Sequence, residues 1–565
     1  MQFIMASMSW QSISAEKRAD IENSIPNDWK IRTSPSEENV MRVPEQCGVL
    51  SHFDLEMTSL PATELVERLA TGDIKAVDVT LSFCKRAAVA HQLVSSTDND
   101  LLRVTDKYQL NCVHEFFPEA ALAQAKELDE YYARHNRPIG PLHGLPISLK
   151  DQLRVKGTET SMGYIAWIGK RDDTDSVLVK LLRKAGAVFY VKTSVPQTLM
   201  VCETVNNIIG RTVNPRNKNW SCGGSSGGEG AILGIRGSVI GVGTDIGGSI
   251  RIPAAFNSLF GIRSSHGRLP YADMANSMEG QETVHSVVGP ISHSIPDLRL
   301  FMKSVLEGEP WKYDSKVIPL PWRQAEEDSI KMKIAREGLN IGIYPHDGVV
   351  LPHPPILRGI DIVRSALPKG GHNVFQWTPY EHELGVNLVN KIYAADGCTD
   401  VYKNINASGE PAIPNIKDLL NPDLPKADVN KIWDMQLQKW HYQRAYLDKW
   451  RELEENMGRE IDAIIAPISP TAAIRHDKFK YYGYASIFNL LDFSSVVIPV
   501  TFADKEKDLK MSDFKAMGDI DADVQAEYDP ETYHGAPVGV QIVGRRLSEE
   551  RILAIAEEIS RILGK

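Results

Sequence analysis

Short apolar runs alternate with helical segments along most of this chain, and this alternation limits the possible folds more than any other feature. The apolar runs predict strands at 145–149, 187–191, 239–243, 339–344, 463–466, 496–500 and 538–543. Apolar spacing and stop residues predict helices at 62–72, 77–91, 120–133 and 176–184. Such alternation predicts an α/β fold with a mixed, mostly parallel β-sheet covered by helices on both faces.

The order of the segments also predicts the domain organisation. Residues 1–55 are expected to form a helical arm followed by a Pro-containing linker. Residues 56–565 are then expected to form a single domain, because large α/β domains exceed the usual domain length. The stretch 314–460 is rich in Pro and Trp and less periodic, so we interpret it as an elaboration that shapes a pocket.

Composition and charge exclude several classes of protein. The net charge is -10 and no long basic run occurs, which argues against a nucleic-acid partner. Six scattered cysteines without a C-x-x-C pair predict neither a disulfide framework nor a metal site. The first residues, MQFIMASMSWQS, lack a basic start followed by a long apolar stretch, so we expect no secretory signal. No apolar run approaches about 20 residues, so we also expect no membrane span and a cytoplasmic location.

One polar segment, residues 94–109, interrupts an otherwise continuous join between two helices. One interpretation is a translated intron, because its ends can be encoded by splice-site-like sequences. The other interpretation is a polar surface loop. A tryptic peptide from within the segment in native protein would exclude the intron.

The densest candidate site lies between Cys222 and Pro270, where two glycine-rich stretches follow each other. The first is GGSSGG at 223–228, and the second is GTDIGGS at 243–249. The second should turn at the end of a strand, with successive N–H groups pointing at one spot suited to an oxyanion. Ser249 ends this turn, which is where a nucleophile belongs.

A serine nucleophile needs a base, and two residues are candidates. Asp245 is close in sequence, but a carboxylate beside an oxyanion would oppose catalysis. Lys150 ends the apolar run of GLPISLKDQ, where desolvation would lower its pKa. A neutral Lys150 amine could accept a proton directly or through the Ser225 hydroxyl.

Other motif matches are open but weaker. Residues 223–227 also fit G-x-S-x-G, which would make Ser225 the nucleophile and require a later acid and histidine. His476 and His534 are the late histidines, and nothing in the sequence marks either of them. S-x-x-K occurs at 82–85 and at two further places, so that match carries little information.

The combination and order of these motifs resemble the amidase-signature family. GGSSGGEGAILGIRGSVIGVGTDIGGSIRIPAAF is similar to its signature, with GPLHGLPISLKD upstream and APVGVQIVGRRL near the C-terminus. Lys150 precedes Ser225 by 75 residues, and Ser225 precedes Ser249 by 24. Within the family the strongest likeness is to fungal acetamidases, in stretches such as KTSVPQTLMVCETVNNIIGRTVNPRNKNWSCGG. The resemblance implies the amidase-signature fold, with residues 56–565 as one catalytic domain.

The resemblance also implies a role for each motif residue. It makes Ser249 the acyl-forming nucleophile, Ser225 a bridging serine after a cis peptide bond, and Lys150 the base. The implied oxyanion hole consists of the N–H groups of Ile246, Gly247, Gly248 and Ser249. The implied supporting residues are Ser226, which would orient Lys150 or Ser225, and the pair Asp245 and Arg251, which would brace the loop.

The implied reaction is hydrolysis of short carboxamides such as acetamide to carboxylate and ammonia, a step of nitrogen metabolism. It would pass through an acyl-enzyme, need no metal or organic cofactor, and have a small amide as its only required partner. Two alternatives are an amidase for longer or aromatic amides and a catalytically silent amidase-like binding protein. A homo-oligomer is compatible with the sequence.

Overall fold

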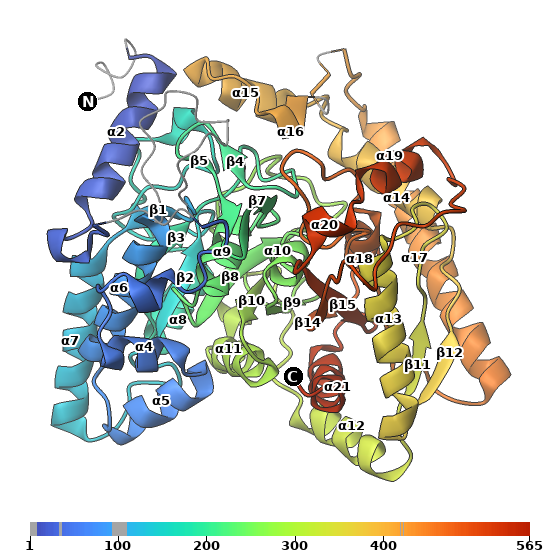
Figure 1. The fold of residues 1–565 in the computed structure, drawn as a ribbon, viewed down its shortest axis with the longest axis horizontal. Coiled ribbons are helices and arrows are strands. Elements are labelled where there is room, and N and C mark those ends of the chain that lie inside the picture. Colours follow the sequence, from blue (N-terminus) through green and yellow to red (C-terminus); the bar gives the residue numbers. More distant parts are fainter. Residues whose placement is uncertain (1–7, 33–36, 93–109, 418–419, 422) are drawn as a thin grey trace.

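A long β-sheet runs through the molecule and carries helices on both faces (Figure 1). The computed structural model describes residues 8–32, 37–92, 110–417, 420–421 and 423–565. Within these residues the sheet has eleven strands in the order β1-β3-β2-β8-β10-β9-β14-β15-β13-β11-β12. The segment 94–109 lies outside the described residues, so both interpretations of it stay predictions.

All seven expected strands are present within two residues of their predicted ends. The strands of the main sheet are β1 Val113–Phe116, β2 Pro146–Lys150, β3 Val188–Thr193, β8 Ile240–Asp245, β9 Phe260–Arg263, β10 Val287–Ser292, β11 Asn340–Ile343, β12 Asn373–Gln376, β13 Ala463–Ala466, β14 Ser495–Phe502 and β15 Pro537–Val543. Two small hairpins pair β4 Val205–Asn206 with β5 Gly210–Arg211, and β6 Val213–Asn214 with β7 Asn217–Ser221. The sequence analysis missed β1, β9, β10 and β12, three of which are only four residues long.

The sheet is mixed as expected, but the prediction that it is mostly parallel is wrong. Among the ten strand pairings of the described sheet, four are parallel. The other six are antiparallel. The parallel pairs lie toward the two ends of the sheet, and its centre is antiparallel.

Two inserted strands explain this difference. β8 and β9 are joined through helix α10 and run parallel to each other, yet β10 lies between them and is antiparallel to both. In the same way β13 and β14 are joined through α18, and β15 lies between them. Strand–helix–strand alternation predicts the relative direction of the joined strands, but it does not reveal a later strand inserted between them.

The helices of the described chain form layers on the two sides of the sheet. Their bounds are α2 Trp10–Asn23, α3 Val43–Gln46, α4 His52–Ser59, α5 Ala62–Thr71, α6 Ala76–Gln92, α7 Pro118–His135, α8 Val177–Lys184, α9 Gly227–Gly234, α10 Arg251–Phe256, α11 Ile295–Glu307, α12 Gln324–Arg336, α13 Pro354–Ala366, α14 His382–Tyr393, α15 Thr399–Ser408, α16 Pro414–Lys417, α17 Val429–Met457, α18 Gly483–Leu491, α19 Asp519–Glu527, α20 Pro530–Tyr533 and α21 Glu549–Ile562. Short 3₁₀ turns are η1 Asn27–Trp29, η2 Ile165–Trp167, η3 Pro310–Lys312 and η4 Pro368–Gly370.

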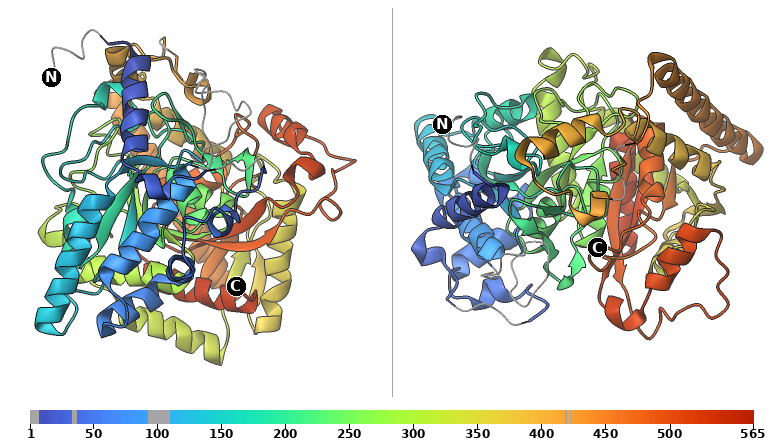
Figure 2. Two further views of the ribbon diagram at one scale, coloured as in Figure 1. Left: turned by 60° about the vertical axis from the view of Figure 1, so that its left-hand side comes forward. Right: turned by 90° about the horizontal axis from the view of Figure 1, so that it is seen from above.

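Near the centre of the sheet, α9 and α10 pack together on one face, and α11 and α21 pack together on the other. The four helices expected from the sequence correspond to α5, α6, α7 and α8. Gly72 follows the last residue of α5 and terminates the helix in the left-handed conformation. The long helix α17 lies along one outer edge of the molecule (Figure 2). Within the described residues, no helix combines the length and the apolar content needed to cross a membrane.

The N-terminal segment packs on the rest of the molecule. Helix α2 contacts β1, and its residues Ile13 and Ile21 are buried in the large apolar core. Figure 2 shows α2 lying along one side of the molecule. The division into an arm of residues 1–55 and one following domain stays a prediction.

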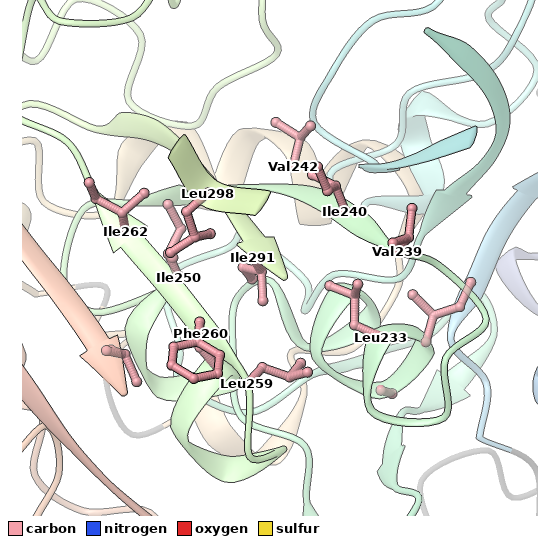
Figure 3. Close-up of a cluster of buried hydrophobic side chains, with 14 of the residues drawn as sticks. Leu233, Val239, Ile240, Val242, Ile250, Leu259, Phe260, Ile262, Ile291 and Leu298 are labelled. Carbon is pink, nitrogen blue, oxygen red and sulfur yellow. The ribbon is translucent and has the colours of Figure 1, made fainter. Parts of the chain in front are cut away.

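The core beside the inserted strand β10 draws residues from several elements. Figure 3 shows this apolar cluster, with side chains contributed by α9, β8, β9, β10 and α11. Ile291 of β10 is fully buried and lies across from Gly261 of β9, its partner in the sheet. All residues of β8, β9 and β10 are buried, so both faces of the sheet are covered here.

Replacing Ile291 with Ala should lower the free energy of unfolding by about 2–5 kcal/mol, because it leaves a cavity between packed strands and helices. Chemical denaturation followed by circular dichroism measures the change. The matched control is Ile520→Ala on α19, where the side chain is exposed and little loss is expected. Equal, small effects of the two substitutions would contradict the central position of β10.

Candidate active site

Lys150 is the last residue of β2, and its side chain is completely buried. Its Nζ lies 2.8 Å from the Ser225 Oγ and 2.7 Å from the Thr244 Oγ1. Burial lowers the pKa of Lys150 to about 7, although nearby carboxylates oppose this shift. About half of the amine is therefore neutral at pH 7 and able to accept a proton.

The carboxyl ends of two parallel strands bring these groups together. β2 and β8 pair in parallel, so Lys150 and Thr244 emerge at the same edge of the sheet. Ser225 lies just before α9 and follows a cis peptide bond from Gly224. Residues 75 and 94 positions from Lys150 in the sequence thus lie within hydrogen-bond distance of its amine.

Ser249 lies in the turn between β8 and α10. The Ser249 carbonyl accepts a hydrogen bond of 3.2 Å from the Ser226 N–H, which joins the two glycine-rich stretches. Gly248 adopts a φ of 119°, and a Cβ there would lie 2.7 Å from the Ala485 Cβ. The turn therefore requires glycine at this position.

The prediction that the Gly248 N–H forms part of the oxyanion hole is wrong. The Gly248 N–H donates to the Asp245 Oδ1 at 2.9 Å, so it is already engaged. The cause is the Asp245 side chain, which folds back over the turn and also accepts from the Ile250 N–H at 3.1 Å. In the described residues, the N–H groups of Ile246, Gly247 and Ser249 donate to no protein acceptor.

Asp245 and Arg251 form the pair that the sequence analysis expected. The guanidinium contacts both carboxylate oxygens at 3.0 Å, and Asn489 donates to the carboxylate at 2.8 Å. Burial alone would raise the pKa of Asp245, but the Arg251 charge and the hydrogen bonds outweigh burial and hold that pKa well below its usual range. A carboxylate held in this way braces the turn and is a poor base.

Ser226 was predicted to orient Lys150 or Ser225, but in the described structure its hydroxyl forms a hydrogen bond to neither residue. Its Oγ bonds to the backbone N–H and carbonyl of Thr244 at 3.3 Å each. The described residues show no bond from its side chain to Lys150 or Ser225. The reason is its position at the start of α9, which turns the hydroxyl toward the end of β8.

Two residues that the sequence analysis missed, Thr244 and Gln152, form the hydrogen bonds next to Lys150 that were expected of Ser226. The Thr244 hydroxyl contacts Lys150 and donates to the Gln152 Oε1 at 2.7 Å. Both belong to the motifs GTDIGGS and SLKDQ, and this position within the motifs is the sequence signal that points to them. Only the pairing of β2 with β8 brings the hydroxyl to the amine.

The geometry does not support a histidine as the base. His476 bonds through Nδ1 to the Glu203 Oε1 at 2.9 Å and through Nε2 to the Lys218 carbonyl at 2.8 Å. The partner of Ser225 is Lys150. The G-x-S-x-G interpretation, which required a histidine beside Ser225, therefore fails.

The protein-family model described as Amidase matches residues 101–553, which is more than half of the chain. The chain belongs to the amidase family. This amidase is 68% identical over 556 residues to an acetamidase of Emericella nidulans, covering 98% of each chain. It is 66% identical over 560 residues to an acetamidase of Aspergillus oryzae, covering 99% of this chain and 100% of that one.

A solved structure of a fatty acid amide hydrolase matches the amidase with a TM-score of 0.89. The two are 33% identical, and the match covers 100% of this chain and 97% of that one. The amidase-signature fold expected from the motifs is therefore confirmed.

Ser249 of the amidase borders two cavities. A small cavity of about 20 Å³ is lined by Ser225 and Ser249 together with Thr244 and Gln152. A second cavity of about 410 Å³ is also lined by Ser249, Ile246 and Gly247, and by aromatic residues that include Tyr393 and Tyr482. The reacting amide is thus expected where the small cavity meets the larger one.

A third cavity, a chamber of about 690 Å³, shares the lining residues Thr198, Met200 and Met278 with the small cavity. The chamber is also lined by residues of α14 and of the segment 396–424. This agrees with the expectation that the stretch 314–460 shapes a pocket.

The pKa of Lys150 predicts how the activity of the amidase depends on pH. If Lys150 acts as the base, only its neutral amine is active, and kcat/KM should be constant well above pH 7 and fall about tenfold per pH unit well below it. Steady-state rates between pH 5 and 9 test this, with the unfolding temperature measured at each pH as the control. A flat profile across pH 5–7 in folded protein would contradict the assignment.

Proposed function

We propose that this amidase hydrolyses acetamide and other short carboxamides to the carboxylate and ammonia, with Ser249 forming the acyl-enzyme. The single observation that carries the substrate assignment is the identity of 66–68% over nearly the whole chain to two proteins named acetamidase.

The relay begins with the neutral amine of Lys150, which accepts the proton of the Ser225 hydroxyl as Ser225 takes the proton of Ser249. The Ser249 Oγ attacks the amide carbon. The carbon–nitrogen bond then breaks, the nitrogen takes the proton back from Ser225, and ammonia leaves. Water hydrolyses the acyl-enzyme through the same three groups. Side chains carry every proton, so the relay uses neither a metal nor an organic cofactor.

The N–H groups of Ile246, Gly247 and Ser249 would stabilise the oxyanion. Their hydrogens are not used within the described protein, and the bracing of Asp245 by Arg251 fixes the turn that carries them. Preorganised donors of this kind contribute because they need not reorient during the reaction.

The release of ammonia would place the reaction in nitrogen metabolism. We also propose a cytoplasmic location. The support is that Cys47, Cys84, Cys112, Cys202 and Cys222 form no disulfide in the described structure, which suits a reducing compartment.

Substitution of the relay residues tests the mechanism. Ser249→Ala should lower kcat for acetamide by about 10⁴-fold or more, because the bond to the acyl group cannot form. Lys150→Ala should lower it by about 10²–10⁴-fold, because the relay loses its base. The assay measures ammonia release. Surface variants Ser512→Ala and Lys391→Ala are the matched controls.

Folded wild-type protein that prefers long or aromatic amides would contradict the substrate assignment and leave the relay intact. Folded protein inert on every amide would be tested again after deletion of residues 94–109. Continued inactivity would favour the silent binding protein.

Met200→Ala should broaden the substrate range by joining the small cavity to the larger chamber. The ratio of kcat/KM for hexanamide to that for acetamide should rise about tenfold, which corresponds to newly burying about two of the additional methylenes of hexanamide at about 0.8 kcal/mol each. Competition between the two amides measures this ratio. The matched control is Met332→Ala on α12, whose side chain is exposed. An unchanged ratio would show that Met200 does not limit substrate size.

A further inference from the structure

Glu229 is a buried carboxyl close to the proton relay, to which no role has yet been given. It lies in the first turn of α9 and is completely buried. Its Oε2 accepts from the Ser148 Oγ at 2.5 Å, and its Oε1 accepts from the Thr193 Oγ1 at 2.7 Å. The Ser148 hydroxyl comes from β2, the strand that carries Lys150, and the Thr193 hydroxyl comes from the neighbouring strand β3.

The three neighbouring strands are shaped around this carboxyl. Ser148 lies two residues before Lys150 on β2 and therefore points to the same face of the sheet. Thr193 of β3 is the register partner of Lys150. Gly241 of β8 is the register partner of Ser148, and a Cβ there would lie 1.8 Å from the Glu229 Oε2. Glycine at 241 therefore makes room for the carboxyl.

Glu229 is one of three carboxyl groups whose charges act on Lys150, the others being Asp245 and Asp151. Asp245 has its own cation in Arg251. Asp151 lies 3.5 Å from the Lys192 Nζ and 3.5 Å from the His114 Nε2.

Glu229 has no such partner. Within the described residues it forms no ion pair, and Lys150 is the only cation whose charge affects it. The other titratable groups near it are Tyr190 and Cys112, and burial raises the pKa of each so that both are neutral. Burial likewise raises the pKa of Glu229 to about 7, against the effect of its hydroxyl partners and of Lys150. A buried carboxyl without a cation of its own is costly, so a purely structural role accounts for it poorly.

We propose that Glu229 is a positioning residue that acts as the counter-charge of Lys150 and stabilises the ammonium formed when Lys150 takes the relay proton. The proposal rests on the proposed relay. No proton passes to Glu229 in the reaction, since its effect on Lys150 is electrostatic and its hydroxyl partners keep the carboxylate in place. The ammonium would otherwise form in a fully buried site, where an uncompensated charge is strongly disfavoured.

The test is Glu229→Gln, which keeps the shape of the side chain and removes its charge. The acid limb of the pH profile of kcat/KM should move to lower pH by about half a pH unit or more, because the lysine loses a charge that favours its protonated form. The plateau should fall about tenfold, because the ammonium formed in the reaction is less stabilised. The matched control is Glu410→Gln, a buried carboxyl held by Asn207 and Gln197, and it should leave the limb in place.

A second readout separates this proposal from the proposed function. The rate at which a fluorophosphonate labels Ser249 depends on the same base but on no amide substrate. Its acid limb should shift in the Glu229→Gln variant even if the wild type does not hydrolyse acetamide.

Thr193→Val covers the case in which Glu229→Gln does not fold. Loss of one hydroxyl donor makes the carboxylate harder to ionise, so the limb should move in the same direction by a smaller amount. A folded Glu229→Gln protein whose acid limb and plateau match those of the wild type would overturn the proposal. If Glu229→Gln does not fold, an unshifted acid limb in folded Thr193→Val protein would overturn it.

Discussion

The burial of one amine, that of Lys150, is the constraint on which the rest of the active site depends. A lysine in water is protonated at neutral pH and cannot accept a proton, whereas full burial lowers its pKa to about 7. Such burial requires that neighbouring strands and a helix cover the end of the strand that carries the lysine. The sheet provides it by placing β2 between β3 and β8, with α9 packed over the same region.

The turn that carries Ser249 depends on a second buried charge. Asp245 and Arg251 are both fully buried and neutralise each other, and Asn489 and Gln541 satisfy further hydrogen-bonding atoms of the pair. A buried pair of this type is weak evidence for stability, but it restricts the turn to one geometry. The same carboxylate takes the Gly248 N–H out of the candidate oxyanion hole. The bracing of the turn therefore also selects which N–H groups of the turn are left without a protein acceptor in the described residues.

Much of the fold could be predicted from the sequence, because each predicted strand is an apolar run with clear stops. The strand β13, for example, has the predicted ends. The strands that escaped prediction lacked such a signal, and β10 contains Gly289 and Pro290 within its six residues. The error in sheet direction has one physical cause, since insertion of β10 and β15 is decided by contacts between segments far apart in the chain.

The sequence by itself determined the chemistry available to this protein: a lysine at the end of an apolar strand, two serines in glycine-rich turns, and their order and spacing. These are properties of local conformation and residue type, so they can be predicted from the sequence alone. Only the tertiary structure decided which of these groups meet. It brought the Thr244 hydroxyl to the amine and Gln152 to that hydroxyl, directed Ser226 away from the amine, and placed Glu229 against β2 and β3. The reason is that hydrogen bonds and electrostatic effects depend on distances in space, and pairing of β2 with β3 and β8 sets those distances between residues that are remote in sequence.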